Sequence, residues 1–282
     1  MKLVRYGEIG AEQPGILDKD GRIRSLSGHL SEIDGNALQP DALARLAAID
    51  LAELPLAPEN PRLGPPLARP GKLIGIGLNY SDHAAESNLP IPKEPIVFMK
   101  ATSAIAGPYD AVVLPADAIK PDWEVELAFV IGRKAKRVTE AEALSHVAGY
   151  LICNDISDRH WQAEREGQWT KGKSHDGFAP LGPWLVTADE IADPGQLAMT
   201  LDVSGVRRQN GSTRTMIFGV AYLVSYLSQF MTLEPGDVVT TGTPPGVGLG
   251  MRPQVWLKHG DVMRLEIEGL GHQEQHVRVE GR

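Results

Sequence analysis

Residues 121–132, Pro-Asp-Trp-Glu-Val-Glu-Leu-Ala-Phe-Val-Ile-Gly, constrain the fold more than any other stretch of the chain. Residues 125–131 have the β-branched and aromatic bias of a buried strand. Glu124 and Glu126 stand two residues apart at its start, and residues i and i+2 of a strand point to the same face. Two adjacent carboxylates in apolar surroundings repel each other and lose hydration, which a divalent cation would offset. The alternative is that both acids line the wet face of an edge strand.

Composition limits the classes of protein to consider. The chain has 282 residues, of which 42% are hydrophobic and 23% charged, as in a globular protein with one large domain or a domain with an appendage. Its net charge of −8 argues against nucleic acid as the main partner, because phosphate binding needs a basic face. The single cysteine, Cys153, excludes a disulfide framework or a multi-thiolate zinc site and is expected to be buried and inert. With no signal-like start and no membrane-length apolar run, we expect a cytoplasmic protein without a membrane partner.

A proline-rich stretch suggests a boundary between two domains. Six prolines lie between residues 55 and 70, a density that neither a helix nor a central strand accommodates. We therefore predict a small N-terminal β domain with its linker over residues 1–68, and a larger second domain over residues 69–282. The first domain should contain a hairpin that turns at residues 18–21 and a helix near residues 40–48.

The second domain shows more strands than helices. Strands are predicted at 73–77, 95–100, 149–156, 181–186, 199–203, 237–241, 254–258 and 261–268. Helices are predicted at 139–148, where a capping box begins at Thr139, and at 215–230, where apolar residues form a stripe. Because the helices fall too irregularly for successive βαβ units, we expect a mixed α+β fold that is mostly β.

One motif is misleading. Residues 167–174, Gly-Gln-Trp-Thr-Lys-Gly-Lys-Ser, match the phosphate-loop pattern, whose mechanism needs a strand before the loop and a helix after it. The preceding residues look helical, and the following Gly- and Pro-rich residues cannot form a helix, so nucleotide binding is rejected. Residues 75–80 do not complete a dinucleotide fingerprint either, since Tyr80 occupies the third glycine position.

A third acid strengthens the case for a metal. Asp155 ends an apolar strand, where an unpaired carboxylate would be costly to bury. Oxygen ligands without cysteine favour Mg²⁺ or Mn²⁺, with coordination positions left for water or substrate.

Three further features could act on a substrate, and each has a plainer interpretation. His83 and Glu86 share a helical face and could form a general-base pair, or simply a surface turn. Lys173 could be an electrophile or carboxylate anchor, or a solvated loop residue. The loop at residues 240–248, Thr-Thr-Gly-Thr-Pro-Pro-Gly-Val-Gly, could clamp a carboxylate or be only a tight turn.

Six ordered blocks identify a family. They are Asn-Tyr-Ser-Asp-His-Ala-Ala-Glu at 79–86, Asp-Trp-Glu-Val-Glu-Leu at 122–127, Asn-Asp-Ile-Ser-Asp-Arg-His-Trp-Gln at 154–162, Gly-Lys-Ser-His-Asp at 172–176, Leu-Glu-Pro-Gly-Asp at 233–237 and Thr-Gly-Thr-Pro-Pro-Gly-Val-Gly at 241–248. Together they resemble the fumarylacetoacetate hydrolase family over about residues 70–270. The N-terminal part resembles a bacterial subgroup that includes 2,4-diketo-3-deoxy-L-rhamnonate hydrolases.

The resemblance implies a β-sandwich roll, usually dimeric, with one Mg²⁺ or Mn²⁺ in each site. It implies that residues 69–282 form a metal-dependent catalytic domain, with Glu124, Glu126 and Asp155 as the metal ligands. His83 and Glu86 would be the water-activating dyad, on a lid that orders when substrate binds. Lys173 would act in catalysis, and the substrate contacts would be Tyr80, Arg159, Gln162, Lys173 and Thr243.

The implied reaction is hydrolysis of the C3–C4 bond of a 2,4-diketo acid, an acylpyruvate. The C1 carboxylate and C2 oxygen would bind the metal, His83 would deprotonate water for attack at C4, and the metal and Lys173 would stabilise the departing pyruvate enolate. With 2,4-diketo-3-deoxy-L-rhamnonate the products would be pyruvate and lactate, in sugar-acid catabolism. The same metal site could instead serve a 2-hydroxyhepta-2,4-diene-1,7-dioate isomerase or an oxaloacetate decarboxylase. A non-catalytic binding or scaffold protein is a further alternative.

The sequence departs from the family at one place. The family usually reads Gly-Lys-Ser-Phe-Asp-Thr, where this chain has His175 and Gly177 in place of the phenylalanine and threonine. The missing threonine hydroxyl bears on the support of the metal and Lys173, and His175 is a candidate for altering substrate preference.

Overall fold

The structure, a computed structural model, describes residues 1–86 and 90–281. The strands are β1 (Lys2–Tyr6), β2 (Gln13–Leu17), β3 (Ile23–Ser25), β4 (Leu63–Gly64), β5 (Leu73–Gly77), β6 (Ile96–Lys100), β7 (Ile105–Ala106), β8 (Val112–Leu114), β9 (Pro121–Asp122), β10 (Val125–Ile131), β11 (Val147–Asn154), β12 (Ser157–Asp158), β13 (Ala179–Thr187), β14 (Ala198–Val203), β15 (Val206–Ser212), β16 (Val238–Thr240), β17 (Val262–Ile267) and β18 (Gly271–Val279). The helices are α1 (Pro40–Ala47), α2 (Ser81–Glu86), α3 (Glu140–Ala143), α4 (Thr170–Lys173) and α5 (Val220–Phe230).

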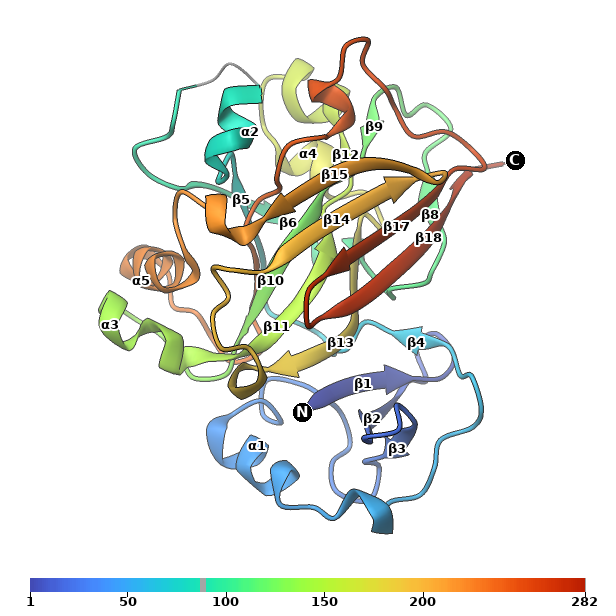
Figure 1. Cartoon of the computed structure of the whole chain (residues 1–282), viewed down its shortest axis with the longest axis vertical. Helices are drawn as coiled ribbons and strands as arrows, with labels where there is room; N and C mark the ends of the chain where they lie inside the picture. Colours follow the sequence, from blue (N-terminus) through green and yellow to red (C-terminus); the bar gives the residue numbers. More distant parts are fainter. Residues whose placement is uncertain (87–89, 282) are drawn as a thin grey trace.

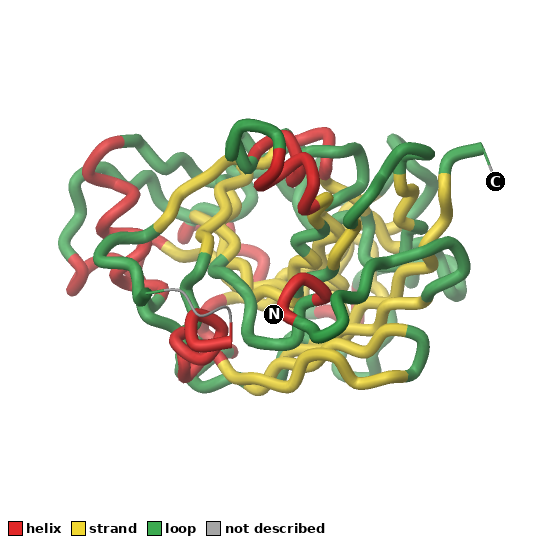
Figure 2. Tube along the Cα trace, turned by 90° about the horizontal axis from the view of Figure 1, so that it is seen from above, coloured by secondary structure: helices red, strands yellow, loops and turns green. Residues whose placement is uncertain are grey.

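Two sheets and a short ribbon organise these strands (Figure 1). The main sheet has the order β3-β2-β1-β13-β11-β10-β16-β5-β6, with β4 also paired to β1 and β7 to β13. The second sheet has the order β15-β14-β17-β18-β8, and β9 pairs with β12 as a separate ribbon. The helices are short and scattered around the strands, as the view from above shows (Figure 2). The expected mixed, mostly β fold is confirmed.

β10 separates two cores because its side chains alternate between the two faces of the main sheet. Val125, Leu127, Phe129 and Ile131 pack into the core shared with the second sheet. Ala128 and Val130 pack into the other core, which the N-terminal residues complete from the opposite side. By the same period of two, Glu124 and Glu126 belong to this second face.

The N-terminal unit continues the main sheet. β1 pairs antiparallel with β13 through Lys2↔Val186 and Leu3↔Leu185, and the hairpin of β2 and β3 extends that edge. The unit lies below the rest of the molecule in Figure 1, where α1 flanks its strands. The predicted turn at residues 18–21 is present, since Asp18 donates its N–H to the carbonyl of Arg22 at 2.9 Å. The domain division after residue 68 stays a prediction.

Some predicted boundaries were wrong. The helix predicted at 139–148 has the expected capping box but ends at Ala143, because Val147 already pairs with Ile131 in the sheet. The helix predicted at 215–230 begins only at Val220. No strand forms at 254–258, where Pro253 lacks a donor and Leu257 makes a backbone bond to Pro121 instead of a ladder.

Two of the longer strands, β18 and β15, were not predicted. β18 was missed because it turns polar side chains inward: Gln273 and Gln275 are fully buried and their amides bond to one another and to backbone carbonyls. β15 was missed because most of its residues are polar or exposed. A hydrophobic pattern cannot reveal a strand whose buried face is polar.

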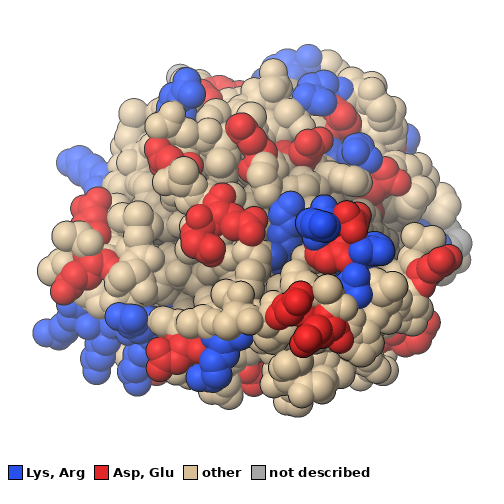
Figure 3. Space-filling model, turned by 60° about the horizontal axis from the view of Figure 1, so that its bottom comes forward, with Lys and Arg blue, Asp and Glu red and all other residues tan. Residues whose placement is uncertain are grey.

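Charged side chains of both signs lie next to each other over much of the face drawn in Figure 3. Arg5 pairs with Glu32 at 2.7 Å within the N-terminal unit, and Arg62 pairs at 2.6 Å with Asp110, which lies outside that unit. No helix in residues 1–86 and 90–281 is long and apolar enough to cross a membrane.

Candidate metal centre and active site

The antiparallel pairing of β10 and β11 brings the three predicted ligands together. Glu126 lies opposite Cys153, so the start of β10 and the end of β11 coincide, and Asp155 follows directly. The carboxylates of Glu124, Glu126 and Asp155 each offer an oxygen within 4.8 Å of the others. Their residues are only 6%, 1% and 0% exposed, respectively. The interpretation of Glu124 and Glu126 as a solvated edge is therefore wrong.

Three buried cations surround these carboxylates. Lys173, at the end of α4, donates to Glu124 Oε2 at 2.7 Å and to Asp155 Oδ2 at 2.6 Å. Lys100, the last residue of β6, donates to Asp155 Oδ1 at 2.5 Å. Arg159 donates from Nη2 to Glu124 Oε1 at 2.6 Å and from Nε to Asp122 Oδ2 at 2.8 Å. Ion pairs thus compensate the charges of Glu124 and Asp155, whereas Glu126 forms no ion pair with Lys173, Lys100 or Arg159.

The pKa values follow this division. Burial alone would raise the pKa of Glu124, but the charges of Arg159 and Lys173 outweigh it and hold that pKa well below its ordinary value. Burial, followed by the negative charges of Asp155 and Glu124, raises the pKa of Glu126 well above its ordinary value. Glu126 accepts the backbone N–H of Gly242 at 2.9 Å, which satisfies one oxygen without compensating the charge. One negative charge of the cluster is therefore left without a cation.

A divalent cation fits this donor set. The three groups are hard oxygen donors, close enough together to share one ion, and no thiol stands among them. Glu124, Glu126 and Asp155 would hold the ion, and it would compensate the charge of Glu126. Mg²⁺ and Mn²⁺ both accept such ligands.

The predicted His–Glu pair is present on α2. His83 donates from Nδ1 to Glu86 Oε2 at 3.0 Å, which leaves Nε2 as the basic nitrogen of the neutral ring. Glu86 Oε1 also accepts the backbone N–H of Gly246 at 3.1 Å. A Cβ on Gly250 would lie 2.9 Å from the Glu86 carboxyl carbon, so glycine gives this carboxylate its space. The pair is seated against the loop 240–248 and the turn that follows.

That loop also reaches the metal cluster. Gly242, with φ +86°, donates to Glu126, whereas Gly246, with φ +106°, donates to Glu86. Both glycines take left-handed backbone conformations that other residues adopt only with strain. A single glycine-dependent loop therefore connects the carboxylate cluster to the His83–Glu86 pair.

The residues predicted to contact the substrate bind different partners in the structure. Arg159 and Gln162 adjoin the cluster, and Arg159 Nη1 donates to Gln162 Oε1 at 3.0 Å. Thr243 donates its hydroxyl to the carbonyl of Val125 at 2.9 Å. Tyr80 is fully buried, and its hydroxyl lies 3.2 Å from Met199 Sδ. Their roles toward a substrate stay predictions.

Three residues of the site were missed from the sequence. Lys100 ends an apolar strand, and a lysine at such a position could have indicated a buried partner. Asp122 is fully buried, and besides Arg159 it accepts the N–H groups of Gly248 and Leu249 at 2.7 and 3.1 Å. Gln209, from the second sheet, donates to Thr243 Oγ1 at 2.8 Å, and no sequence signal indicated it.

Residues 167–174 lack the strand–loop–helix context of a phosphate loop. No strand precedes residues 167–174, and Lys173 faces the two carboxylates instead of an open loop. Beyond it, Phe178 donates its N–H to His175 in a tight turn, where Gly177 has φ +77°. Glycine accommodates this backbone conformation, in which a threonine would be strained. His175 packs against Phe178 with ring centroids 4.9 Å apart.

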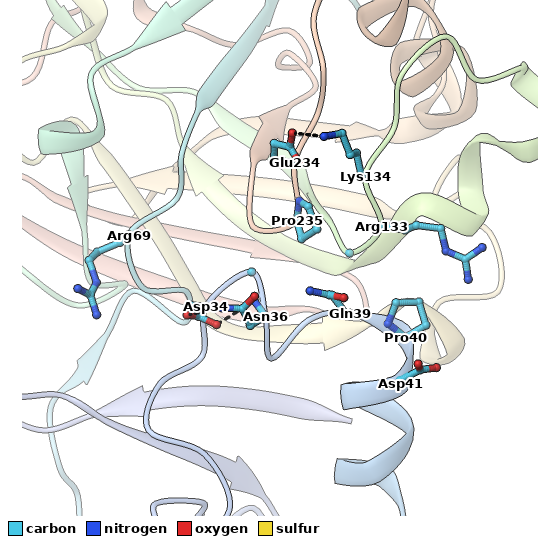
Figure 4. Close-up of a pocket in the computed structure, with 12 residues that line it drawn as sticks. Asp34, Asn36, Gln39, Pro40, Asp41, Arg69, Arg133, Lys134, Glu234 and Pro235 are labelled. Atoms are coloured by element: carbon cyan, nitrogen blue, oxygen red, sulfur yellow. Dashed lines mark hydrogen bonds and ion pairs between the residues drawn. The ribbon is translucent and has the colours of Figure 1, made fainter.

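The opposite end of β10 borders a different cleft. This cleft, of about 780 Å³, lies between the N-terminal unit and the turns after β10 and before β16 (Figure 4). Lys134 and Glu234 form an ion pair at 2.9 Å across one side. The side chains of Arg69 and Arg133 lie on opposite sides of it (Figure 4). The charged side chains that line this cleft do not gather into one cluster, unlike the carboxylates and cations around Glu126.

Known proteins resemble the chain over nearly its whole length. A presumed hydrolase of Burkholderia lata is 58% identical over 279 residues, which cover 99% of each chain. A maleylpyruvate hydrolase from Sphingobium sp. SYK-6, solved with manganese(II) and pyruvate, shares 28% identity with a TM-score of 0.83, over 99% of both chains. A 2-hydroxyhepta-2,4-diene-1,7-dioate isomerase from Mycobacterium marinum shares 32% identity with a TM-score of 0.75, over 100% of both chains.

The family follows from the sequence match and the site together. The profile of the fumarylacetoacetate (FAA) hydrolase C-terminal region matches residues 72–278, which include every residue of the cluster and of the His83–Glu86 pair. The match to enzymes that are hydrolases or isomerases agrees with a buried site rich in acid and base groups. The chain therefore belongs to the fumarylacetoacetate hydrolase family.

Proposed function

We propose that the protein is a metal-dependent hydrolase that cleaves the C3–C4 bond of a 2,4-diketo acid. One observation carries the proposal: Glu126 is a buried carboxylate without a cationic partner, beside two carboxylates that are already neutralised. Such a charge is costly in a protein interior unless a cation joins it. Its setting therefore supports a resident divalent ion, as in the manganese-containing relative.

The metal and the protein would have separate tasks. A bound Mg²⁺ or Mn²⁺ would act as a Lewis acid that stabilises negative charge on the oxygens of the pyruvate portion. Lys173 has three N–H donors, of which two bind Glu124 and Asp155, so one remains for an oxygen of the substrate. The Arg159 guanidinium likewise retains donors beyond its three bonds to carboxylates and Gln162.

His83 supplies the base in this proposal. Its Nε2 is free to accept a proton from water, while Glu86 holds the tautomer and stabilises the imidazolium that forms. The hydroxide equivalent adds to the C4 carbonyl, and the C3–C4 bond breaks with its electron pair moving into the pyruvate enolate. The proton on His83 can then return to C3 of that enolate, which yields pyruvate and the second carboxylic acid.

The candidate substrate is 2,4-diketo-3-deoxy-L-rhamnonate, which would yield pyruvate and lactate in sugar-acid catabolism. Its support is the resemblance of the N-terminal residues to that bacterial subgroup. The pyruvate in the maleylpyruvate hydrolase structure supports a pyruvate-forming reaction more generally.

The test is to incubate purified protein and Mg²⁺ or Mn²⁺ with 2,4-diketo acids, including the deoxyrhamnonate derivative and maleylpyruvate. Pyruvate is measured with lactate dehydrogenase, and metal-free protein serves as the control. Metal-dependent pyruvate release is expected, and no release from any diketo acid would overturn the proposal.

Isomerisation is the second candidate, supported by the likeness to the Mycobacterium marinum isomerase. Enolate stabilisation would serve this reaction too, without the attack of water. NMR of the products separates the two, because hydrolysis yields two fragments whereas an isomerase returns one product of the same mass.

A further inference from the structure

Lys100 is a fully buried lysine that the proposed chemistry leaves without a task. Its side chain is 0% exposed, and Nζ donates to Asp155 Oδ1 at 2.5 Å and to the carbonyl of Ile156 at 3.2 Å. Burial lowers its pKa, an effect that the charge of Asp155 partly offsets. Natural cores rarely keep a lysine in such a place unless its charge is needed or paired.

Direct contacts join Lys100 to one continuous group of buried charges. Lys100 and Lys173 bind the two oxygens of Asp155, and Lys173 continues to Glu124. Arg159 then links Glu124 to Asp122, and Glu126 completes the carboxylate cluster. Glu86 does not belong to this group, since its bonds go to His83 and Gly246.

The sign of this group depends on Lys100. With Glu126 ionised, four carboxylates face three cations, which leaves one net negative charge that a divalent ion would compensate. With one divalent ion bound, the same group carries one net positive charge, and without Lys100 the loaded centre would be neutral. Fields in a buried site act over several ångströms with little screening, so a single charge matters to an anionic ligand.

We propose that Lys100 sets the charge of the metal-loaded centre and thereby selects a carboxylate-bearing, anionic substrate. It acts through Asp155 and touches no reacting atom, so it is a positioning residue. The inference rests on the proposed function, because it requires a divalent ion on Glu124, Glu126 and Asp155.

Loss of the Lys100 charge should change the affinity for the metal ion and the affinity for an anionic substrate in opposite directions. A cation near the metal ligands repels the metal, so its loss should leave metal binding as tight as before or tighter. The same cation attracts the anion that binds to the loaded centre, so its loss should weaken anion binding. A residue needed only for local folding would weaken both.

The experiment compares wild type with Lys100→Gln, which keeps an amide donor for Asp155 but removes the charge. Mn²⁺ affinity is measured from the EPR signal of free Mn²⁺. Oxalate, a planar dianion that resembles an enolate, is then titrated calorimetrically at saturating Mn²⁺, with correction for the complex that the two form in solution. Lys100→Met removes both the donor and the charge and serves as a second variant.

Lys72 offers a matched control. Its Nζ lies 2.5 Å from Oδ2 of the buried Asp237. Lys72 and Asp237 stand just before β5 and β16, whereas Lys100 is the last residue of β6 and Asp155 follows β11. Lys72→Gln therefore removes a lysine–aspartate pair of the same length, with a lysine side chain that is 26% exposed, from the other end of the sheet. Thermal unfolding of all variants verifies that they are folded.

We expect Lys100→Gln to bind oxalate at least about tenfold more weakly and Mn²⁺ no more weakly than wild type, with Lys72→Gln unchanged in both. Unchanged oxalate affinity in Lys100→Gln, or a joint loss of both ligands, would overturn the inference while leaving the metal site standing. Wild-type protein that binds no Mn²⁺ would overturn the proposed function and the inference together.

Discussion

The Glu86 carboxylate and the backbone N–H of Gly246 lie 3.1 Å apart, a hydrogen bond that joins α2 to the loop 240–248. Gly242, four residues earlier in that loop, donates to Glu126 at 2.9 Å. The candidate base and the candidate metal ligand are thus held by one segment of backbone. The geometry of this loop, as much as any side chain, positions the two halves of the site.

Glu126→Gln should abolish metal binding without harming the fold. The glutamine keeps an acceptor for the Gly242 N–H but removes the charge that a cation would compensate. We expect at least about a hundredfold loss of Mn²⁺ affinity, measured by EPR. The free energy of unfolding of the metal-free protein should stay equal or rise by about 1–2 kcal/mol, because a neutral amide needs neither a bound proton nor a cation in this buried position. Wild-type Mn²⁺ affinity in this variant would contradict the assigned ligand set.

His83→Ala should separate metal binding from turnover. Loss of a general base costs typically about 10²- to 10⁴-fold in kcat, while the three carboxylates remain intact. Pyruvate release and Mn²⁺ titration measure the two effects. His276, which lies 3.8 Å from Glu274 and is 64% exposed, provides the control: His276→Ala should change neither. Unaltered turnover in His83→Ala would remove the dyad from the mechanism.

Gly250→Ala should disturb Glu86 and spare the metal. The new Cβ would come within 2.9 Å of the Glu86 carboxylate, the mobile end of a side chain, so the loop can remain folded while Glu86 moves. A displaced Glu86 no longer orients His83, and we expect kcat to fall by about tenfold or more at unchanged Mn²⁺ affinity. Gly28→Ala, where nothing lies within 4 Å of the added carbon, should behave as wild type. Equal kcat in the two variants would argue against the seating of Glu86 in this turn.

The stability of the metal-free protein should fall as pH rises above the ordinary pKa of a glutamic acid, about 4.5. Burial and the charges of Asp155 and Glu124 raise the pKa of Glu126, so the folded state favours its protonated form. The stability that this preference contributes is present at low pH and is lost as pH rises through the raised pKa. Because Mn²⁺ binds the carboxylate form, its affinity should increase over the same range. Thermal unfolding with and without Mn²⁺ across a pH series tests both trends, which Glu126→Gln should flatten.

Local sequence patterns determined much of the architecture. The apolar run 125–131, the hairpin turn at 18–21 and the capping box at Thr139 each depend on neighbours within a few residues, and the structure contains all three. Strands such as β18 were not predictable in this way, since Gln273 and Gln275 are buried by partners more than 90 residues away. The rejection of nucleotide binding also depended only on local context around Lys173.

In the site, too, some features follow from the local sequence and others only from the tertiary structure. The residue types and their order were sufficient to propose Glu124, Glu126 and Asp155 as neighbours, because a strand period of two and the ends of adjacent strands bring such residues together. Sequence alone could not show that Lys100 and Arg159 neutralise two of the three carboxylates and leave Glu126 uncompensated. Charge compensation depends on distances of a few ångströms between residues far apart in the chain, and only the packing of β6, β10, β11 and α4 sets those distances.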